Sequence, residues 1–472
     1  MFIISYYNAP IICGVFMHVL IRLFPSLFML YGCGGSSTGN KNDVSASQNC
    51  SIPDALAAIE RRPLLVVRVN YNDITFRNDA ESWARRIFGD APHELNHYYE
   101  TISYGRFGFA QADETDGASD GLVTVSLDKD HPDSGQSTSV QADLAAALKA
   151  ADPFVDFSGY DTDGDGSISS GELIIIFILA GNEDAFSGEN ALPGVWAHTS
   201  CLQANPVPRL DGTYLMGCSG GGNYSVFGER DVDTSIGYDR DATIGVIAHE
   251  LGHAAFDLPD LYDTSGASAG IGYFGLMGSG LWGQASLNDP YGNTPVHMTA
   301  WSKMQNGWII PEIVADTAHS DLLLYDNASQ DYNAALLPIG EGQCFMLENR
   351  GSDGYDAGLN ILPGYYRGGM AIWHIDQRVI DANVGTNTVN ADVLHKGVDL
   401  EEASNSVLDD GPEYAGDVRN LYYRPNATAF TPQSTPSTQR YDGSDSNVSI
   451  TEISEPGTVM QAVAVNPNTG GV

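Results

Sequence analysis

Basic residues are scarce in this chain. Its 472 residues include 22 lysines and arginines against 60 aspartates and glutamates, which gives a formal net charge of −38. Binding to the phosphates of nucleic acids needs a basic surface, so the composition excludes nucleic acid as an expected partner. A strongly acidic composition suits a soluble extracellular protein that binds divalent cations.

Cysteine is also rare, and long apolar runs are confined to the N-terminus. There are six cysteines and no Cys-x-x-Cys pair, so zinc ligation by thiolates is not expected. Cys201 and Cys218 flank a turn-rich stretch, and we expect a disulfide between them outside the cytoplasm. Cys50 with Cys344 is a pairing by elimination only. No segment after the N-terminal region is long and apolar enough to span a membrane.

The N-terminal segment has the features of an export signal. Residues 19–30 are apolar with Arg22 near the start, and Leu30-Tyr31-Gly32-Cys33 resembles a lipoprotein processing box. We therefore expect a lipoprotein signal peptide at 1–33, a lipid on Cys33 and a flexible tether at 34–55. A general signal peptide with an incidental cysteine is the alternative.

The start codon is open between Met1 and Met17, because the second would leave a signal of ordinary length. With either start, we expect an exported lipoprotein of the outer membrane or cell surface. The protein could also be released to the extracellular space. The lipid on Cys33 would be its sole link to the membrane.

The strongest chemical signal is His249-Glu250-Leu251-Gly252-His253, which follows an apolar run at 244–248. Residues four apart on a helix share a face, so His249 and His253 can bind one zinc ion. Glu250 projects toward the same pocket and can take a proton from water as the general base. The alternative is an ordinary amphipathic helix whose two histidines are satisfied by hydrogen bonds.

A catalytic zinc site needs a third protein ligand and one open position. The motif is soon followed by Asp257-Leu258-Pro259-Asp260-Leu261-Tyr262-Asp263, and the chain must turn there because Pro259 cannot continue a helix. The turn can bring a carboxylate back to the metal. The residues alone leave Asp257, Asp260 and Asp263 open as that ligand.

A second local signal is the glycine-rich segment 270–280 around Met277. So many glycines beside one methionine indicate a tight turn beneath the site, like the methionine turn of metzincin peptidases. A flexible glycine loop whose methionine fills a gap in the core is the alternative.

With these motifs in this order, the chain resembles the immune inhibitor A family of secreted bacterial metallopeptidases over most of the mature protein. The family's zinc signature corresponds to His249–His253 followed by Leu258–Asp263. Further similarities occur at His97–Phe107, Gly194–His198 and Asn306–Pro311.

The resemblance implies Asp260 as the third zinc ligand. The chain departs from the family in one place: many members have glycine three residues after the second histidine, where Phe256 stands here. One extra residue then separates His253 from the Pro-Asp pair. Glu348–Arg350 and Trp373–Asp376 also recur in the family, and either packing or a further metal site could explain them.

A second metal site is predicted at 161–172, which fits the twelve-residue calcium loop. Aspartates occupy its first, third and fifth positions, glycine the sixth and glutamate the twelfth. The expected calcium ligands are Asp161, Asp163, Asp165, Ser167, Ser169 and Glu172. A solvated turn is the alternative. Because a buried strand is predicted directly afterwards at 173–179, we expect a structural clamp rather than a calcium switch.

Alternating strand and helix signals predict an α/β, zincin-like catalytic domain over 56–315, with an active-site helix and a methionine turn. Besides the active-site helix, the expected elements are strands at 63–69 and 173–179 and helices at 79–88, 91–104, 143–151 and 295–304. Short apolar runs separated by Gly, Asp and Asn turns predict a β-rich, sandwich-like domain over 316–472. Its expected strands lie at 322–325, 343–348, 370–375, 448–453 and 459–465, the last two as a hairpin.

Together these features predict a monomeric zinc endopeptidase that acts on proteins or peptides, with one catalytic zinc and at least one structural calcium. A tyrosine or His198 is expected to stabilise the oxyanion. Two other functions remain open: a non-catalytic calcium-binding adhesion protein with a decayed zinc site, and a zinc hydrolase of a non-peptide substrate.

Overall fold

The computed structural model describes residues 50–132, 137–188, 192–203, 207–218, 222–235, 237–404 and 407–469. The predicted signal segment with Cys33, and residues 34–49 of the predicted tether, lie outside the described residues. Within the part of the chain that is described, no helix is long and apolar enough to cross a membrane.

A mixed sheet forms the centre of the N-terminal part, with the strand order β11-β10-β5-β1-β2. Strands β1, β2, β3, β5 and β10 pair in parallel, whereas β7 and β11 pair antiparallel to β10. The strands of this sheet are β1 (Glu60–Asn70), β2 (Phe107–Gln111), β3 (Leu122–Ser126), β5 (Ile174–Glu183), β6 (Gly194–Val195), β7 (His198–Ser200), β10 (Tyr224–Asp233) and β11 (Tyr238–Asp241). Strand β5 confirms the buried strand predicted at 173–179.

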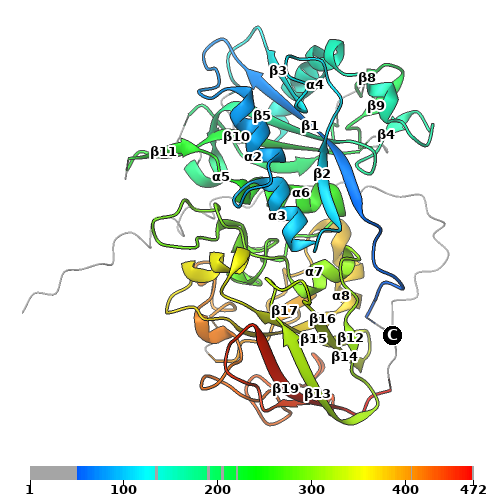
Figure 1. Ribbon diagram of the computed structural model, residues 1–472, viewed down its shortest axis with the longest axis vertical. Helices are drawn as coiled ribbons and strands as arrows, with labels where there is room; N and C mark the ends of the chain where they lie inside the picture. Colours follow the sequence, from blue (N-terminus) through cyan, green and yellow to red (C-terminus); the bar gives the residue numbers. More distant parts are fainter. Residues whose placement is uncertain are drawn as a thin grey trace, which may run out of the picture. The chain divides into compact units, whose positions relative to one another are not determined.

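Helices cover both faces of this sheet (Figure 1). Alternate residues of β1 face opposite sides: Leu64 and Val66 pack with α2, α3 and α6, whereas Leu65 and Val67 pack with α4. The α-helices among the described residues are α2 (Ala80–Phe88), α3 (Leu95–Ile102), α4 (Ser137–Ala151), α5 (Asp184–Ser187), α6 (Ile244–Phe256), α7 (Ala300–Gln305) and α8 (Gln377–Asn383).

Two of the predicted helices are shorter in the structure. Helix α3 covers only the middle of 91–104, and α7 begins five residues later than the predicted start at 295. Thr299 sets the start of α7, because its side chain accepts a hydrogen bond from the Ser302 N–H. Helix α4, in contrast, begins at Ser137, six residues before the predicted start.

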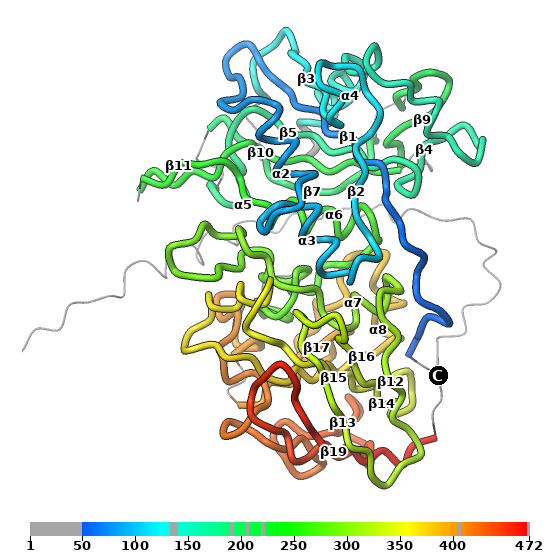
Figure 2. The backbone as a smooth tube through the Cα atoms, viewed as in Figure 1, coloured from blue at the N-terminus to red at the C-terminus, as the bar shows by residue number. Residues whose placement is uncertain are grey.

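The C-terminal part contains two further sheets, with the orders β12-β14-β15-β16-β17 and β13-β19-β18. Their strands are β12 (Glu312–Ile313), β13 (Thr317–Tyr325), β14 (Ala334–Gly340), β15 (Gln343–Arg350), β16 (Gly369–Asp376), β17 (Val398–Leu400), β18 (Ser449–Thr451) and β19 (Val459–Asn466). Strands β13 and β19 run side by side and antiparallel although they are far apart in sequence (Figure 2). Four of the five strand-like runs predicted in this region fall within these strands, and β18 covers only the middle of the run at 448–453. Strands β18 and β19 are paired as the predicted hairpin.

The larger C-terminal sheet joins two cores. One face shares a hydrophobic cluster with β13 and β19, through residues such as Phe345 and Met460. The other face, with Met346 and Trp373, belongs to the same cluster as Ala248 of α6. The helix with the histidine motif is therefore packed into a core that continues into the C-terminal part.

The described part of the chain contains two disulfides. Cys201 pairs with Cys218, and Cys50 pairs with Cys344 of β15. The second links the start of the described chain to the C-terminal sheet. A fourth, small sheet consists of β4 (Ser167–Ile168), β9 (Thr213–Leu215) and β8 (Arg209–Leu210), and it includes Ser167 and Ile168 of the predicted calcium loop.

Candidate metal centre and peptidase site

Helix α6 holds the two histidines and the glutamate of the predicted zinc motif. Gly252 lets the helix lie directly on the glycine-rich segment, because a Cβ at this position would be 2.5 Å from Met277 Sδ. Asp257 ends the helix in the left-handed conformation, with φ of 52°. Phe256, which stands where many family members have glycine, is thus the last helical residue. The turn falls one position later, at Asp257, and this shift accommodates the extra residue between His253 and the Pro-Asp pair.

Three donor atoms converge beside α6. His249 Nε2 lies 3.0 Å from Asp260 Oδ1, and His253 Nε2 lies 3.2 Å from the same oxygen. The two Nε2 atoms are 3.2 Å apart. Zinc bonds of about 2.0–2.1 Å in a tetrahedron require donors about 3.3 Å apart, so these separations fit one zinc ion with its fourth position open.

Backbone carbonyls fix the tautomers of both imidazoles. His249 Nδ1 donates to Leu276 O at 3.0 Å, and His253 Nδ1 donates to Leu258 O at 2.5 Å. Each Nε2 therefore carries a lone pair, and both lone pairs are directed at the Asp260 carboxylate and at each other. Three lone-pair donors at this separation repel one another unless a cation or proton lies between them, so the donor set itself fits a metal.

The electrostatics of the cluster agree with this. Burial disfavours a charged imidazole, yet the Asp260 carboxylate outweighs it and raises the pKa of His253 to about 9. The pKa of Asp260 itself is held far below its usual value by the two imidazoles, although burial acts in the opposite direction. The cluster attracts positive charge.

The other two aspartates after the helix have different surroundings. Asp257 is exposed at the end of α6. Asp263 is fully buried, and its carboxylate accepts hydrogen bonds from the N–H groups of Ser265 and Ser268 and from the Ser268 hydroxyl. The structure therefore brings Asp260, and neither Asp257 nor Asp263, to the two histidines.

Glu250 is 9% exposed and lies on the same side of the helix as the donor atoms, where its charge acts on His253, His198 and Tyr262. The Tyr262 ring stacks on His249, with ring centroids 6.2 Å apart. Burial and the neighbouring Asp260 carboxylate raise the pKa of Tyr262 well above its usual value, so this phenol keeps its proton. Its hydroxyl hydrogen-bonds to the Asp260 carboxylate, so Tyr262 would have to exchange that bond to act as the tyrosine predicted for the oxyanion.

His198 has its ring nitrogens engaged elsewhere. Nδ1 lies 2.9 Å from Trp196 O, and Nε2 lies 3.3 Å from the Tyr224 hydroxyl. Burial lowers the pKa of His198, so the imidazole is neutral. It is adjacent to the site without presenting a free ring nitrogen to it.

The glycine-rich segment 270–280 packs against helix α6 and against the loop that holds Asp260. Leu276 supplies the carbonyl that orients His249, and the next residue, Met277, is 1% exposed beneath Gly252. Met277 O accepts a hydrogen bond from the Leu261 N–H at 2.8 Å, which links the glycine-rich segment to the loop that holds Asp260. One short segment thus positions the helix and the loop together.

Comparison with known proteins agrees with this geometry. Residues 68–309, more than half of the chain, match the family described as "Immune inhibitor A peptidase M6, catalytic domain". The chain belongs to the immune inhibitor A peptidase family. The matched region contains the whole donor triangle together with Glu250, so the donor triangle lies in the peptidase catalytic domain.

The remaining comparisons add little to this assignment. No curated protein is significantly similar to the chain. The crystal structure of wild-type OgpA from Akkermansia muciniphila covers 70% of this chain and 88% of its own, at 12% identity and a TM-score of 0.26. That likeness is too slight to support an argument about this immune inhibitor A peptidase.

One contact of the site could not be found from the motif. Asn387, which lies outside the region matched to the immune inhibitor A family, accepts from the Asp260 N–H at 2.7 Å and donates to Asp260 Oδ2 at 2.6 Å. It is 127 residues from Asp260 in the chain, and no local pattern marks it.

The predicted calcium loop folds around its last residue. The side chains of Asp161, Asp163 and Glu172 come together, with donor atoms within 4.8 Å of one another. Gly166, at the sixth position, has φ of 85°, as the sharp turn requires. Asp161 Oδ1 is buried without a hydrogen-bond partner, and a cation would satisfy it.

The other predicted calcium ligands are engaged within the loop. Asp165 accepts from the Ser167 N–H at 2.7 Å, and the Ser169 hydroxyl donates to Glu172 Oε2 at 2.9 Å. The Ser167 backbone is also paired to β9. The structure thus brings three of the six predicted calcium ligands together in one cluster.

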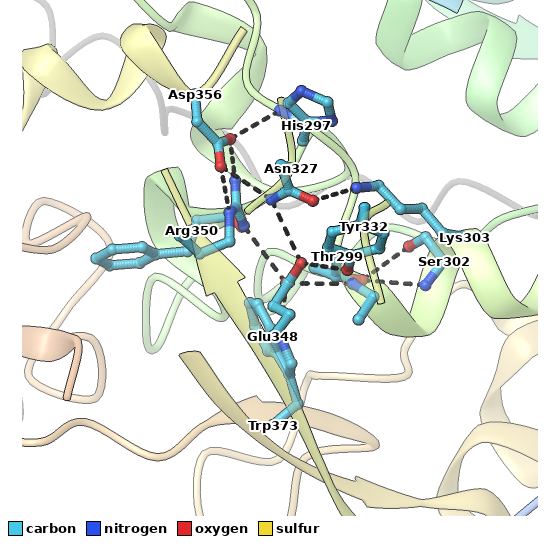
Figure 3. Close-up of polar contacts among 12 residues, drawn as sticks. His297, Thr299, Ser302, Lys303, Asn327, Tyr332, Glu348, Arg350, Asp356 and Trp373 are labelled. Atoms are coloured by element: carbon cyan, nitrogen blue, oxygen red, sulfur yellow. Dashed lines mark hydrogen bonds and ion pairs between the residues drawn. The ribbon is translucent and has the colours of Figure 1, made fainter. Parts of the chain in front are cut away.

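The Glu348–Arg350 motif forms a buried ionic cluster with Asp356 (Figure 3). Arg350 donates to both oxygens of Asp356, at 2.8 and 2.6 Å, and also to Phe274 O in the glycine-rich segment. Glu348 accepts from the Trp373 indole at 2.8 Å. Because N–H and O–H donors already occupy these carboxylates, the structure favours packing over a further metal site for this motif.

Proposed function

We propose that this peptidase is a zinc-dependent endopeptidase that hydrolyses peptide bonds of proteins, with Glu250 as its general base. The triangle of His249, His253 and Asp260 supports the proposal most strongly. Its donor separations suit zinc, its tautomers leave both Nε2 atoms free, and the general base projects from the same helix.

Zinc, when bound, would act as a Lewis acid and lower the pKa of water to about 7. The chain's own residues would do the rest. Glu250 takes a proton from the attacking water and transfers it to the leaving amine. Tyr262 keeps its proton and donates a hydrogen bond to the carbonyl oxygen as negative charge develops there.

The proposal includes the finer points of architecture and location. We assign the catalytic part a zincin-like fold with a methionine turn at Met277, and the C-terminal part a sandwich-like arrangement. The two disulfides suit an oxidising compartment and so support export. A lipid anchor at Cys33, a place in the outer membrane or at the cell surface, and a monomeric state complete the proposal.

Cleavage of an unfolded protein by the purified chain tests this function. We expect new amino termini in casein, loss of cleavage with a zinc chelator, and recovery on addition of zinc. An ester substrate run in parallel identifies a hydrolase of non-peptide bonds. A zinc-loaded chain that cuts no protein would contradict the proposal and favour an adhesion protein with a decayed site.

A structural calcium ion at 161–172 is the second part of the proposal, supported by the Asp161, Asp163 and Glu172 cluster and by the buried oxygen of Asp161. Glu172 would be the bidentate ligand. Glu172→Gln is expected to require at least about tenfold more calcium for the same protection, because one charged ligand is lost. Limited proteolysis at graded calcium concentrations measures this.

Asp156→Asn is the matched control, because Asp156 is an exposed carboxylate just outside the loop. It should retain the calcium dependence of the wild type. If the wild type resists proteolysis equally with and without calcium, no structural calcium is bound here.

A further inference from the structure

Asn387 forms a two-way hydrogen-bonded pair with Asp260. Its side-chain oxygen accepts from the Asp260 N–H at 2.7 Å, and its side-chain nitrogen donates to Asp260 Oδ2 at 2.6 Å. Asp260 is 5% exposed, so little water competes with this pair. The amide therefore holds both the backbone and the carboxylate of the proposed third ligand.

The pair divides the two oxygens of the carboxylate. Oδ2 is bound to Asn387, whereas Oδ1 is the atom 3.0 Å from His249 Nε2 and 3.2 Å from His253 Nε2. A carboxylate held by the Tyr262 hydroxyl alone could turn and offer both oxygens to a metal. Held by Asn387, Asp260 would offer one oxygen to the metal. The fourth position of the metal would then stay free for water.

We propose that Asn387 is a positioning residue that fixes Asp260 as a one-oxygen ligand and thereby makes the C-terminal part a component of the metal site. This inference rests on the proposed zinc function. Asn387 lies beyond residues 68–309, the region matched to the peptidase catalytic domain. It would act on the metal through Asp260.

The chain around Asn387 is itself held in place. Asn387 follows a short 3-10 helix at Val384–Thr386 and has φ of 54°, a left-handed conformation that asparagine tolerates. Its carbonyl accepts from the Thr264 hydroxyl at 3.3 Å. Asn390 then donates to Leu261 O at 2.9 Å, and it is buried. Residues 387–390 of the C-terminal part thus form hydrogen bonds with Asp260, Leu261 and Thr264 of the loop.

Partners of this kind usually contribute about 10–100-fold to metal affinity. Asn387→Gly removes both hydrogen bonds and suits the left-handed backbone. We expect it to raise the zinc dissociation constant of the full chain about 10–100-fold, measured against a competing chelator. Cobalt substituted for zinc should show a changed visible absorption spectrum, because the ligand geometry changes.

Thr386→Gly is the matched control, since Thr386 is exposed in the same loop and bonds to Asn383 and Thr388 rather than to Asp260. It should bind zinc as the wild type does. Thermal unfolding of the metal-free proteins should show both glycine variants folded, with Asn387→Gly the less stable because it leaves the buried Asp260 N–H and Oδ2 without a partner. Asn387→Asp keeps an oxygen for the Asp260 N–H, so it tests the bond to Oδ2 in a loop that stays docked, and its cobalt spectrum should also change.

Wild-type zinc affinity and an unchanged cobalt spectrum in Asn387→Gly would overturn the inference, as would an equal loss of affinity in Thr386→Gly. Such results would leave the proposed function intact. A wild-type chain that binds no zinc would instead overturn the proposed function, and the inference with it.

Discussion

Glu250→Gln is expected to lower kcat for peptide hydrolysis by about three orders of magnitude while the zinc content stays at the wild-type level. The amide has the shape of the carboxylate but cannot accept the proton of the attacking water, and general bases contribute about 10²–10⁴-fold. Glu250 is not among the residues that form the donor triangle, so zinc should remain bound. The measurement is the initial rate on a protein substrate at equal, verified zinc loading.

Asp257→Asn is the control for this experiment. Asp257 is a nearby carboxylate that is exposed at the end of α6, and asparagine tolerates its left-handed conformation. This variant should retain both zinc and activity. Full activity in Glu250→Gln would exclude the general-base role, and loss of zinc from it would make Glu250 a ligand instead.

Arg350→Met is expected to reduce the free energy of unfolding by about 3–5 kcal/mol, because it leaves buried carboxylates without their cation. Arg350 is fully buried, and its guanidinium binds both oxygens of Asp356 and lies 3.7 Å from Glu348. Burial opposes the charge on Arg350, yet these carboxylates raise its pKa above the ordinary value. Denaturant unfolding followed by fluorescence measures the loss.

Arg419→Met removes an exposed arginine that pairs with Asp417 at 2.6 Å, and it serves as the matched control. Solvent screens that pair, so the control should unfold like the wild type. An Arg350→Met variant as stable as the control would show that the buried cluster does not stabilise the fold.

Local patterns could predict the helical part of the site. The four-residue spacing of His249 and His253 requires a shared helical face, and the structure has both on α6. The glycines around Met277 could likewise predict a tight turn, because this signal is also local in the sequence. These features depend on residues a few positions apart, and so does the spacing that predicts a calcium loop at 161–172.

The third corner of the donor triangle could not be derived from the residues alone. Asp257, Asp260 and Asp263 all follow the helix closely, and the choice depends on which residue takes the left-handed turn. Because Asp257 does so, Asp263 is directed toward the serine N–H groups of its own loop and Asp260 toward the histidines. The family resemblance indicated Asp260 where spacing could not.

Contacts between distant segments were beyond any local pattern. Asn387 reaches Asp260 across 127 residues, and Arg350 reaches Phe274 across 76. Both join the C-terminal part to residues near the histidine helix, and no periodicity encodes such contacts. The boundaries of α7 were missed for a smaller reason: the capping bond of Thr299 moves the helix start beyond Pro295.

Zinc-edge X-ray absorption on the purified wild-type chain is the most direct test of the metal centre. We predict one zinc per chain, bound at about 2.0–2.1 Å by two imidazole nitrogens and by oxygen ligands, one of them from Asp260. In Asp260→Asn this ligand set should change. Zinc with a different ligand set in the wild type, or an identical spectrum in Asp260→Asn, would contradict the assignment of His249, His253 and Asp260.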